Sequence, residues 1–269
     1  MPIYKAISFQ TVLSGGRTKP WLVLVDTGEN GVQPYVMKLF DSYNLDARDH
    51  VTAEVIGYVL TKEFDFNVPE AAFIEINEDF LSTIQNEEHY WLLERKDARL
   101  KFGSSLVDNA YLFDTRSEYP NPIKLLDLQM LFAFDNLIRN RDRNNYKPNL
   151  LIRDTEIYLI DHEMGLELTS QTIIDFKNEF WDKRFADYHI SVNYLKVWDK
   201  EIKTRYFETF EEYLKNLKLT VLETYFKQLG QLGFSTDRHI LLREYFQEIK
   251  NNSAKFVRIL KSTLDDKRF

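Results

Sequence analysis

The segment from Asn140 to Glu163 constrains the fold of this chain more than any other stretch. It begins with a polar loop and continues with two apolar runs, 149–152 and 157–160, separated by the four residues RDTE. Two short apolar runs around a polar turn predict a small β-hairpin. The stretch directly before the loop, residues 123–138, is strongly apolar and long enough for a buried helix. The segment therefore predicts a buried helix, a polar loop and a hairpin in succession.

The first 95 residues are rich in predicted strands. Apolar runs at Trp21–Val25 and Tyr35–Phe40 flank a turn-rich segment, which predicts a hairpin. Apolar residues at helical spacing predict a helix over Asp49–Phe64. Two further strands are expected at Ala71–Ile76 and Tyr90–Leu93. The predicted order is therefore strand, strand, helix, strand, strand.

The second half of the chain is predicted to be helical. Residues 171–269 alternate apolar and charged residues at helical spacing, with a break near 228–238. We therefore expect an α+β fold with a β-rich part over residues 1–95 and a mainly helical part over residues 96–269. A nucleotide could lie where the two parts join, because small-molecule sites favour such boundaries.

Composition argues against several classes of site and location. A net charge of −7 argues against a protein that coats nucleic acid, which needs a basic face. The chain has no cysteine, so disulfides, zinc–thiolate sites and thiol catalysis are excluded. Neither a signal peptide nor an apolar run of membrane-spanning length is visible. We expect a cytoplasmic protein that binds neither a membrane nor nucleic acid directly.

Three polar residues around the predicted hairpin suit the chemistry of phosphoryl transfer. This reaction needs a carboxylate to orient the attacking hydroxyl and oxygen ligands to hold magnesium against the phosphates. Asp142 is placed for the first task, whereas Asn149 and Asp161, at the two ends of the hairpin, are placed for the second. Ordinary turn residues would explain the same spacing about as well, because Asp and Asn are common in loops.

The same segment resembles the catalytic core of the HipA-like kinases. Their pattern D-R-x-x-x-N-P-N-L-L, followed by a short hairpin and L-I-D-H, is similar to residues 142–151 and 159–162 of this chain. The resemblance implies that Asp142 is the catalytic base and Asn149 a magnesium ligand. It also implies that Asp161 is the metal-binding aspartate of a site that binds ATP and Mg²⁺.

Two positions depart from the motifs of kinases. Lys147 stands where the family pattern leads us to expect asparagine, which leaves the hydrogen bonding of the loop open. Asn140 replaces the histidine of the protein-kinase H-R-D motif, as is expected for this branch. The resemblance as a whole implies a two-lobed protein-kinase-like fold.

Two charged residues upstream extend the resemblance. Lys38 lies in an apolar strand run and looks like the kinase lysine that neutralises nucleotide phosphates. Taken alone, an edge-strand lysine on a solvated face is the commoner explanation of such a residue. Glu54, on the predicted helix, is expected to pair with Lys38 as part of the catalytic machinery, the alternative being an exposed helix glutamate.

Two further segments are candidates for nucleotide contacts. Gly15 and Gly16 could form a turn over the phosphates, with Arg17 adding positive charge, although a plain hairpin would look the same. The connection between the two parts, whose backbone would bind adenine, is expected at three residues: Leu93, Glu94 and Arg95.

The resemblance implies an ATP-dependent phosphotransferase, with the hydroxyl of a serine or threonine in a protein substrate as the acceptor. Two alternatives stay open: a kinase-fold enzyme that acts on a small molecule or lipid head group, and a nucleotide-binding module without catalysis. Some HipA-like kinases are toxins paired with a DNA-binding antitoxin. An antitoxin or another regulatory protein is therefore a candidate partner.

Overall fold

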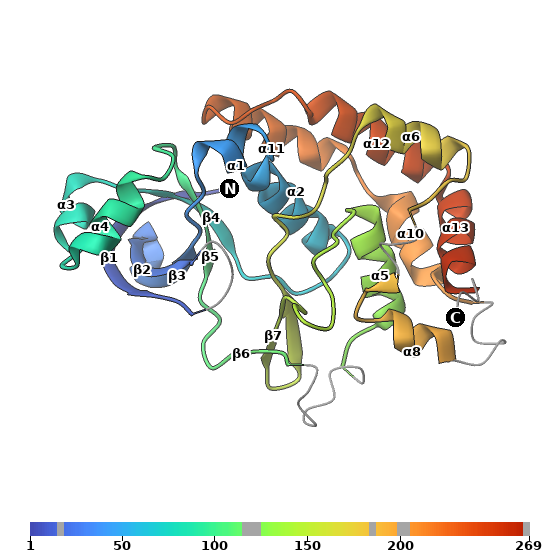
Figure 1. Cartoon of the computed structure of the whole chain (residues 1–269), viewed down its shortest axis with the longest axis horizontal. Coiled ribbons are helices and arrows are strands. Elements are labelled where there is room, and N and C mark those ends of the chain that lie inside the picture. Colours follow the sequence, from blue (N-terminus) through green and yellow to red (C-terminus); the bar gives the residue numbers. More distant parts are fainter. Residues whose placement is uncertain (15–18, 115–124, 183–186, 198–204, 266–269) are drawn as a thin grey trace.

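A closed barrel of five strands forms one end of the molecule (Figure 1). The computed structural model describes residues 1–14, 19–114, 125–182, 187–197 and 205–265. The strands follow the order β1-β2-β3-β5-β4 around the barrel, with β1 antiparallel to β2 and parallel to β4. Their bounds are β1 (Ile3–Val12), β2 (Trp21–Asp26), β3 (Val32–Met37), β4 (Ala71–Glu75) and β5 (Lys101–Ser105).

Apolar side chains at every second position fill the inside of the barrel. Along β2, Trp21, Val23 and Val25 are fully buried, whereas the two leucines between them are half-buried. This period of two is the one that a strand with one face in a core requires. The 3-10 helix η1 (Gly28–Asn30) links β2 to β3.

Two pairs of helices interrupt the barrel strands. The first pair lies between β3 and β4, and the second between β4 and β5. The second pair lies outside the barrel, on the side away from the other helices, whereas α2 lies between the barrel and those helices (Figure 1). The bounds are α1 (Ser42–Asp46), α2 (His50–Glu63), α3 (Glu78–Ser82) and α4 (Glu87–Glu94).

The chain leaves the barrel after β5 and enters a three-stranded sheet of order β6-β7-β8. Helices make up most of the described chain from there on (Figure 1). Among the described residues, no helix combines the length and the apolar character that crossing a membrane would require. The bounds are β6 (Tyr111–Leu112), α5 (Leu128–Leu137), β7 (Leu150–Arg153), β8 (Glu156–Leu159), α6 (Ser170–Lys177), α8 (Val192–Val197), α10 (Glu208–Asn216), α11 (Thr220–Gln231), α12 (His239–Asn251) and α13 (Ser253–Asp265).

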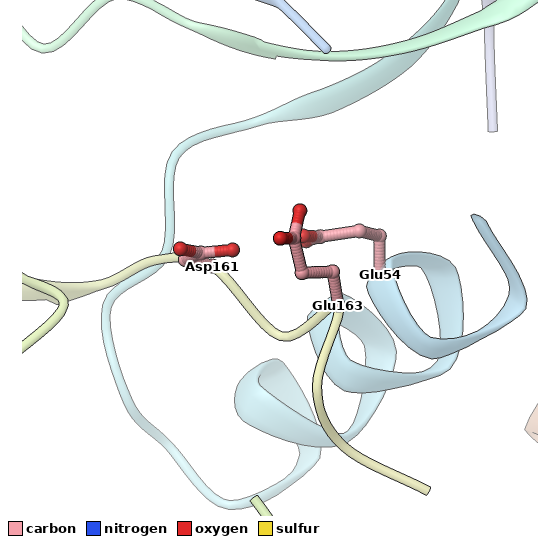
Figure 2. A group of neighbouring side chains, drawn as sticks. All are labelled: Glu54, Asp161 and Glu163. Atoms are coloured by element: carbon pink, nitrogen blue, oxygen red, sulfur yellow. The ribbon is translucent and has the colours of Figure 1, made fainter. Parts of the chain in front are cut away.

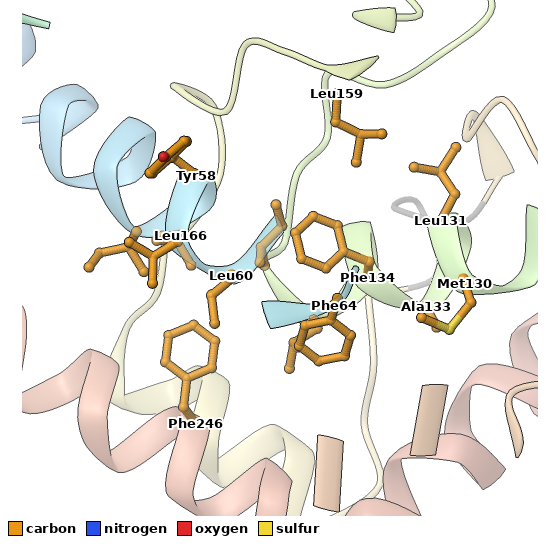
Figure 3. Packing of buried hydrophobic residues seen from close by; sticks show 14 of the residues in the cluster. Tyr58, Leu60, Phe64, Met130, Leu131, Ala133, Phe134, Leu159, Leu166 and Phe246 are labelled. Carbon is orange, nitrogen blue, oxygen red and sulfur yellow. The ribbon is translucent and has the colours of Figure 1, made fainter. Parts of the chain in front are cut away.

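Helix α2 shares an apolar core with the helices that follow the barrel in sequence. Phe64, at the C-terminal end of α2, lies beside Phe134 of α5 with ring centroids 5.5 Å apart (Figure 3). Leu60 of α2 and Phe246 of α12 belong to the same buried cluster. Although α2 is inserted between two barrel strands, it is packed as part of the helical body.

The mixture of strands and helices agrees with the expected α+β class, and several predicted elements are confirmed. The helix predicted over Asp49–Phe64 is α2, the apolar helix before the polar loop is α5, and the hairpin is β7–β8. The break near 228–238 separates α11 from α12. The barrel includes β5 and therefore extends beyond residue 95, where the sequence places the end of the β-rich part.

The strand predicted at Tyr90–Leu93 is wrong, since these residues lie in α4. A short apolar run does not distinguish a buried strand from a helix. The helix has a clear start, because the side chain of Asn86 accepts a hydrogen bond from the N–H of Glu88 in the acidic first turn. Strand β1 was not predicted from the sequence. Two register shifts along it break the alternation of its side chains, which is the pattern that indicates a strand.

Replacing Phe134 by alanine should lower the free energy of unfolding by about 3–5 kcal/mol, because it leaves a cavity where α2 meets α5. Phe134 is fully buried, and its ring also lies 5.4 Å from that of Phe66. Urea unfolding would measure the change. Ile240→Ala on α12 is the control, since Ile240 is 64% exposed and its truncation should cost less than about 1 kcal/mol. Equal losses in the two variants would contradict this account of the core.

Candidate active site

A cavity of about 980 Å³ lies between the barrel, α2 and the β7–β8 hairpin. Val36 and Ala71 of the barrel and Leu159 of β8 supply apolar walls. Lys38 and Asp161 bring charge to the same cavity. Its volume is in the range of clefts that hold small molecules of drug or nucleotide size.

Lys38, which directly follows β3, is the centre of a cluster of charges. Its Nζ donates a hydrogen bond to Oε1 of Glu54, from α2. It also donates to Oδ1 of Asp161 at 2.6 Å and to Oε2 of Glu163 at 3.1 Å. Figure 2 shows the three carboxylates converging from α2 and from the loop that follows β8. The contact between Lys38 and Glu54 that the sequence predicts is present, and one ammonium is shared by three carboxylates.

The electrostatics of this cluster shift the pKa values of Glu54, Lys38 and Asp161. Burial raises the pKa of Glu54 to about 7, and the carboxylates of Asp161 and Glu163 act in the same direction, against the charge of Lys38. Burial opposes the charged form of Lys38, but the three carboxylates outweigh it and raise the pKa well above its ordinary value. Burial also opposes ionisation of Asp161, but Lys38 and Lys147 outweigh it and hold the pKa of that carboxyl well below its usual range.

The two ends of the β7–β8 hairpin carry the predicted metal ligands. Leu150 pairs with Leu159 across the hairpin, and the N–H of Ile160 donates to the carbonyl oxygen of Asn149 at 3.1 Å. Asn149 and Asp161 both have left-handed backbones, with φ of 51° and 62°. Asn and Asp adopt this conformation more readily than other non-glycine residues. The hairpin therefore brings both side chains to the same cavity, as expected from the sequence.

Asp142 lies in the loop before the hairpin and faces the same group of residues. Nδ2 of Asn149 lies 3.5 Å from Oδ2 of Asp142, and Nζ of Lys147 donates to that same oxygen. Lys147 also contacts Oδ2 of Asp161 at 3.0 Å. Burial opposes the charge of Lys147, but the carboxylates of Asp161 and Asp142 raise its pKa above the ordinary value. The residue at which the chain departs from the family pattern thus links the two acidic groups of the candidate site.

A buried ion pair holds the loop that carries Asp142. Arg143 is 1% exposed, and its Nε donates to Oδ2 of Asp135, on α5, at 2.6 Å. Its Nη1 donates to the carbonyl oxygen of Asn149 at 2.7 Å, and Nε2 of His189 lies 2.9 Å from the same oxygen of Asp135. Burial would raise the pKa of Asp135, but the charges and hydrogen bonds of Arg143 and His189 together outweigh it and lower the pKa. This network fixes the loop at both ends, next to Asp142 and at Asn149.

His162 connects α2 to the loop after β8. Its Nε2 lies 3.2 Å from Oγ1 of Thr61, and its side chain packs on Gly57, both residues of α2. A Cβ at Gly57 would come within 2.5 Å of Cβ of His162, so a larger residue does not fit. Burial lowers the pKa of His162 to about 3, so the imidazole is neutral at physiological pH. The helix with Glu54 and the loop with Asp161 are therefore in direct contact.

The predicted phosphate-covering turn lies at the edge of what the structure describes. Gly15, Gly16 and Arg17 fall outside the described residues. Leu13 and Ser14, which directly precede them, line the cavity. The chain therefore reaches the cavity immediately before the predicted turn.

The connection from the barrel to the helical body is not at the three residues expected from the sequence, Leu93, Glu94 and Arg95. Leu93 and Glu94 belong to α4, Arg95 directly follows that helix, and Leu93 packs into the barrel core. The cause is the insertion of α3 and α4 between β4 and β5, which moves the last barrel strand to Lys101–Ser105. Leu106 and Val107, just after β5, line the cavity where the chain leaves the barrel.

Sequence reasoning misses three residues of the site. Glu163 directly follows the Asp-His pair and adds a third carboxylate to Lys38. Asp135 is the one charged residue of the mostly apolar helix α5, and a buried charge of this kind signals a partner. His189 lies in no motif, and its contact with Asp135 becomes visible only in the folded chain.

The donor atoms near the hairpin suit a hard divalent cation. Asp161 offers a carboxylate and Asn149 an amide carbonyl, and oxygen atoms are the ligands that Mg²⁺ prefers. Glu54, Asp161 and Glu163 also place one oxygen each within 4.8 Å of one another, but Lys38 already contacts all three. Asn149 and Asp161 are therefore residues that could hold such a cation at the two ends of the hairpin.

The model of the HipA-like kinase family matches residues 7–224 of the chain. The chain therefore belongs to the HipA-like kinase family, which confirms the resemblance found in its catalytic segment. Among solved structures it is similar to the crystal structure of a Helicobacter pylori proinflammatory kinase, CtkA, with a TM-score of 0.53 and 10% sequence identity. The similarity covers 97% of each chain and, at this identity, concerns the fold alone. No curated protein matches the chain.

The raised pKa of Glu54 predicts a specific dependence of stability on pH. The folded protein holds this proton up to about pH 7, whereas the unfolded chain releases it near its ordinary pKa of 4.5. The free energy of unfolding of the wild type should therefore fall, relative to that of Glu54→Gln, by about 2–3 kcal/mol between pH 5 and pH 8. Urea unfolding of both proteins at the two pH values measures this. A difference that stays constant with pH would show that Glu54 is not the titrating group.

Gly57→Ala should destabilise the protein by about 1–3 kcal/mol, because the new methyl group overlaps His162. Alanine is otherwise the better helix former, so the loss would report the contact and not helix propensity. Gly230→Ala in α11 is the matched control. Its Cβ would meet one methyl group of Thr236 at 3.0 Å, and we expect little loss or a gain in thermal stability. Equal effects of the two substitutions would contradict the tight packing at Gly57.

Proposed function

We propose that this chain transfers the γ-phosphoryl group of ATP, in the presence of magnesium, to the hydroxyl of a serine or threonine in a protein. One observation carries the proposal: Lys38, Asn149 and Asp161 line a single cavity. Asp142 lies next to this cavity, because its carboxylate contacts Lys147 and Asn149, which line it. A two-lobed kinase arrangement, with the barrel as the nucleotide-binding lobe, is part of the proposal.

Each residue has a role that its contacts support. The ammonium of Lys38 would bind phosphate oxygens, and its pairing with Glu54 keeps the side chain extended into the cavity. Asn149 and Asp161 would hold the magnesium ion, which supplies neutralising charge to the triphosphate. Val36, Ala71 and Leu159 offer apolar surfaces for the flat adenine ring. The protein therefore contributes mainly position and electrostatics.

Asp142 would orient the acceptor hydroxyl and receive its proton. As the hydroxyl oxygen forms a bond to the γ-phosphorus, the bond from that phosphorus to the bridging oxygen of ADP breaks. The side chain of Asp142 is 22% exposed, so an acceptor can approach it from solvent. The buried contacts of Arg143 keep the loop in place during this step.

A protein acceptor is the part of the proposal that rests on the family and not on the geometry of the site. Protein is the acceptor implied by the resemblance to HipA-like kinases, the family to which the chain belongs. An antitoxin or another regulatory protein remains a proposed partner on the same grounds.

The purified protein, incubated with γ-labelled ATP, magnesium and a cell lysate, should transfer label to protein. Asp142→Ala and Asp161→Ala should each reduce the rate by about a hundredfold or more, because each removes a group that acts on the reacting atoms. Asp79→Ala on the exposed helix α3 is the matched control and should keep full activity. Labelling by both active-site variants at the wild-type rate would refute the proposal. Label found solely in small molecules would contradict the protein acceptor.

A further inference from the structure

Lys147 occupies an unusual position between the two acidic groups of the site. Its Nζ donates to Oδ2 of Asp142 and lies 3.0 Å from Oδ2 of Asp161. The other oxygen of Asp161, Oδ1, is bound by Lys38 at 2.6 Å. Two ammonium groups therefore hold the two oxygens of one carboxylate, each from its own side of the cavity.

The backbone at Lys147 is fixed more firmly than its side chain. Its N–H donates to Oδ1 of Asn144 at 3.1 Å, and the next residue is Pro148, whose carbonyl oxygen accepts from the buried Arg143 at 3.2 Å. The side chain, by contrast, is 38% exposed and lines the cavity. Because the backbone of Lys147 is held and its ammonium group is partly exposed, the ammonium group can move over a short distance while the loop stays in place.

The contacts of Lys147 with Asp142 and Asp161 would change if ATP and magnesium occupied the cavity. A divalent cation held by Asp161 would supply the charge that Lys147 now gives that carboxylate, and the two positive charges would repel each other. Asp142 must also turn its oxygen to the acceptor hydroxyl. A phosphoryl group between Asp142 and Asp161 would be the nearest uncompensated negative charge, within reach of the same side chain.

We propose that Lys147 is a catalytic residue that binds the transferring phosphoryl group. In the nucleotide-free protein its ammonium neutralises Asp142 and Asp161; in the loaded enzyme it contacts the oxygens of the γ-phosphoryl group. One side chain then serves as counter-ion in the first state and as phosphate ligand in the second. This inference rests on the proposed function, because it assumes that ATP and magnesium bind in this cavity.

The inference predicts how the protein distinguishes ATP from ADP, which lacks the γ-phosphoryl group. Calorimetric titrations with magnesium and either ADP or a non-hydrolysable ATP analogue give the ratio of the two dissociation constants without any catalytic turnover. Lys147→Met should reduce the preference for the ATP analogue by about 10- to 100-fold, the usual effect of losing one charge-assisted hydrogen bond. Lys147→Arg, which keeps the charge, should retain most of the preference.

Lys227→Met is the control for loss of a positive charge elsewhere, since Lys227 is an exposed residue of α11. It should leave both dissociation constants unchanged. The same preference in Lys147→Met as in the wild type, with nucleotide still bound, would overturn the role of Lys147 and leave the proposed function intact. Absence of binding of either nucleotide to the wild type would overturn the proposed function and this inference together.

Discussion

The arrangement of the site depends on the ammonium group of Lys38, because it joins three separate pieces of the chain. Lys38 follows β3, and its partners Glu54, Asp161 and Glu163 come from α2 and the loop after β8. Three carboxylates this close would repel one another without a cation between them. The position of the barrel relative to the hairpin is therefore controlled in part by charge. Entry of a polyphosphate and its counter-ions would change that balance at the point where the pieces meet.

The loop from Asp142 to Asn149 is held on one side by buried contacts and is exposed to solvent on the other. Arg143, fully enclosed, ties the loop to α5 and to the start of the hairpin. Tyr146, in the same loop, is completely exposed, and Lys147 is partly so. A buried charge that loses its partner is strongly destabilising, so this network specifies one backbone geometry. The residues that meet an incoming molecule remain free to adjust.

The parts of the fold and site that were predictable are those that local patterns encode. The helical spacing of apolar residues is sufficient to predict α2. The spacing of the motif is sufficient to select Asp142, Asn149 and Asp161 as candidate site residues. The contacts that complete the site link distant positions: Glu163 reaches Lys38 across 125 residues, and His189 reaches Asp135 across 54. Such contacts arise from tertiary packing, which a single sequence does not display. The insertion of α4 was missed for a different reason, since a short apolar run is compatible with either helix or strand.

The packing of α2 has a consequence for how activity can be controlled. Kinase-like enzymes can be switched by the position of the helix whose glutamate pairs with the strand lysine. Here that helix is wedged against His162 through Gly57 and shares its apolar core with α5 and α12. Swinging it outward would open a hydrophobic interior to water, at a cost far above that of a surface rearrangement. Control of the proposed kinase activity would therefore be expected to leave α2 in place and to act at the opening of the cavity.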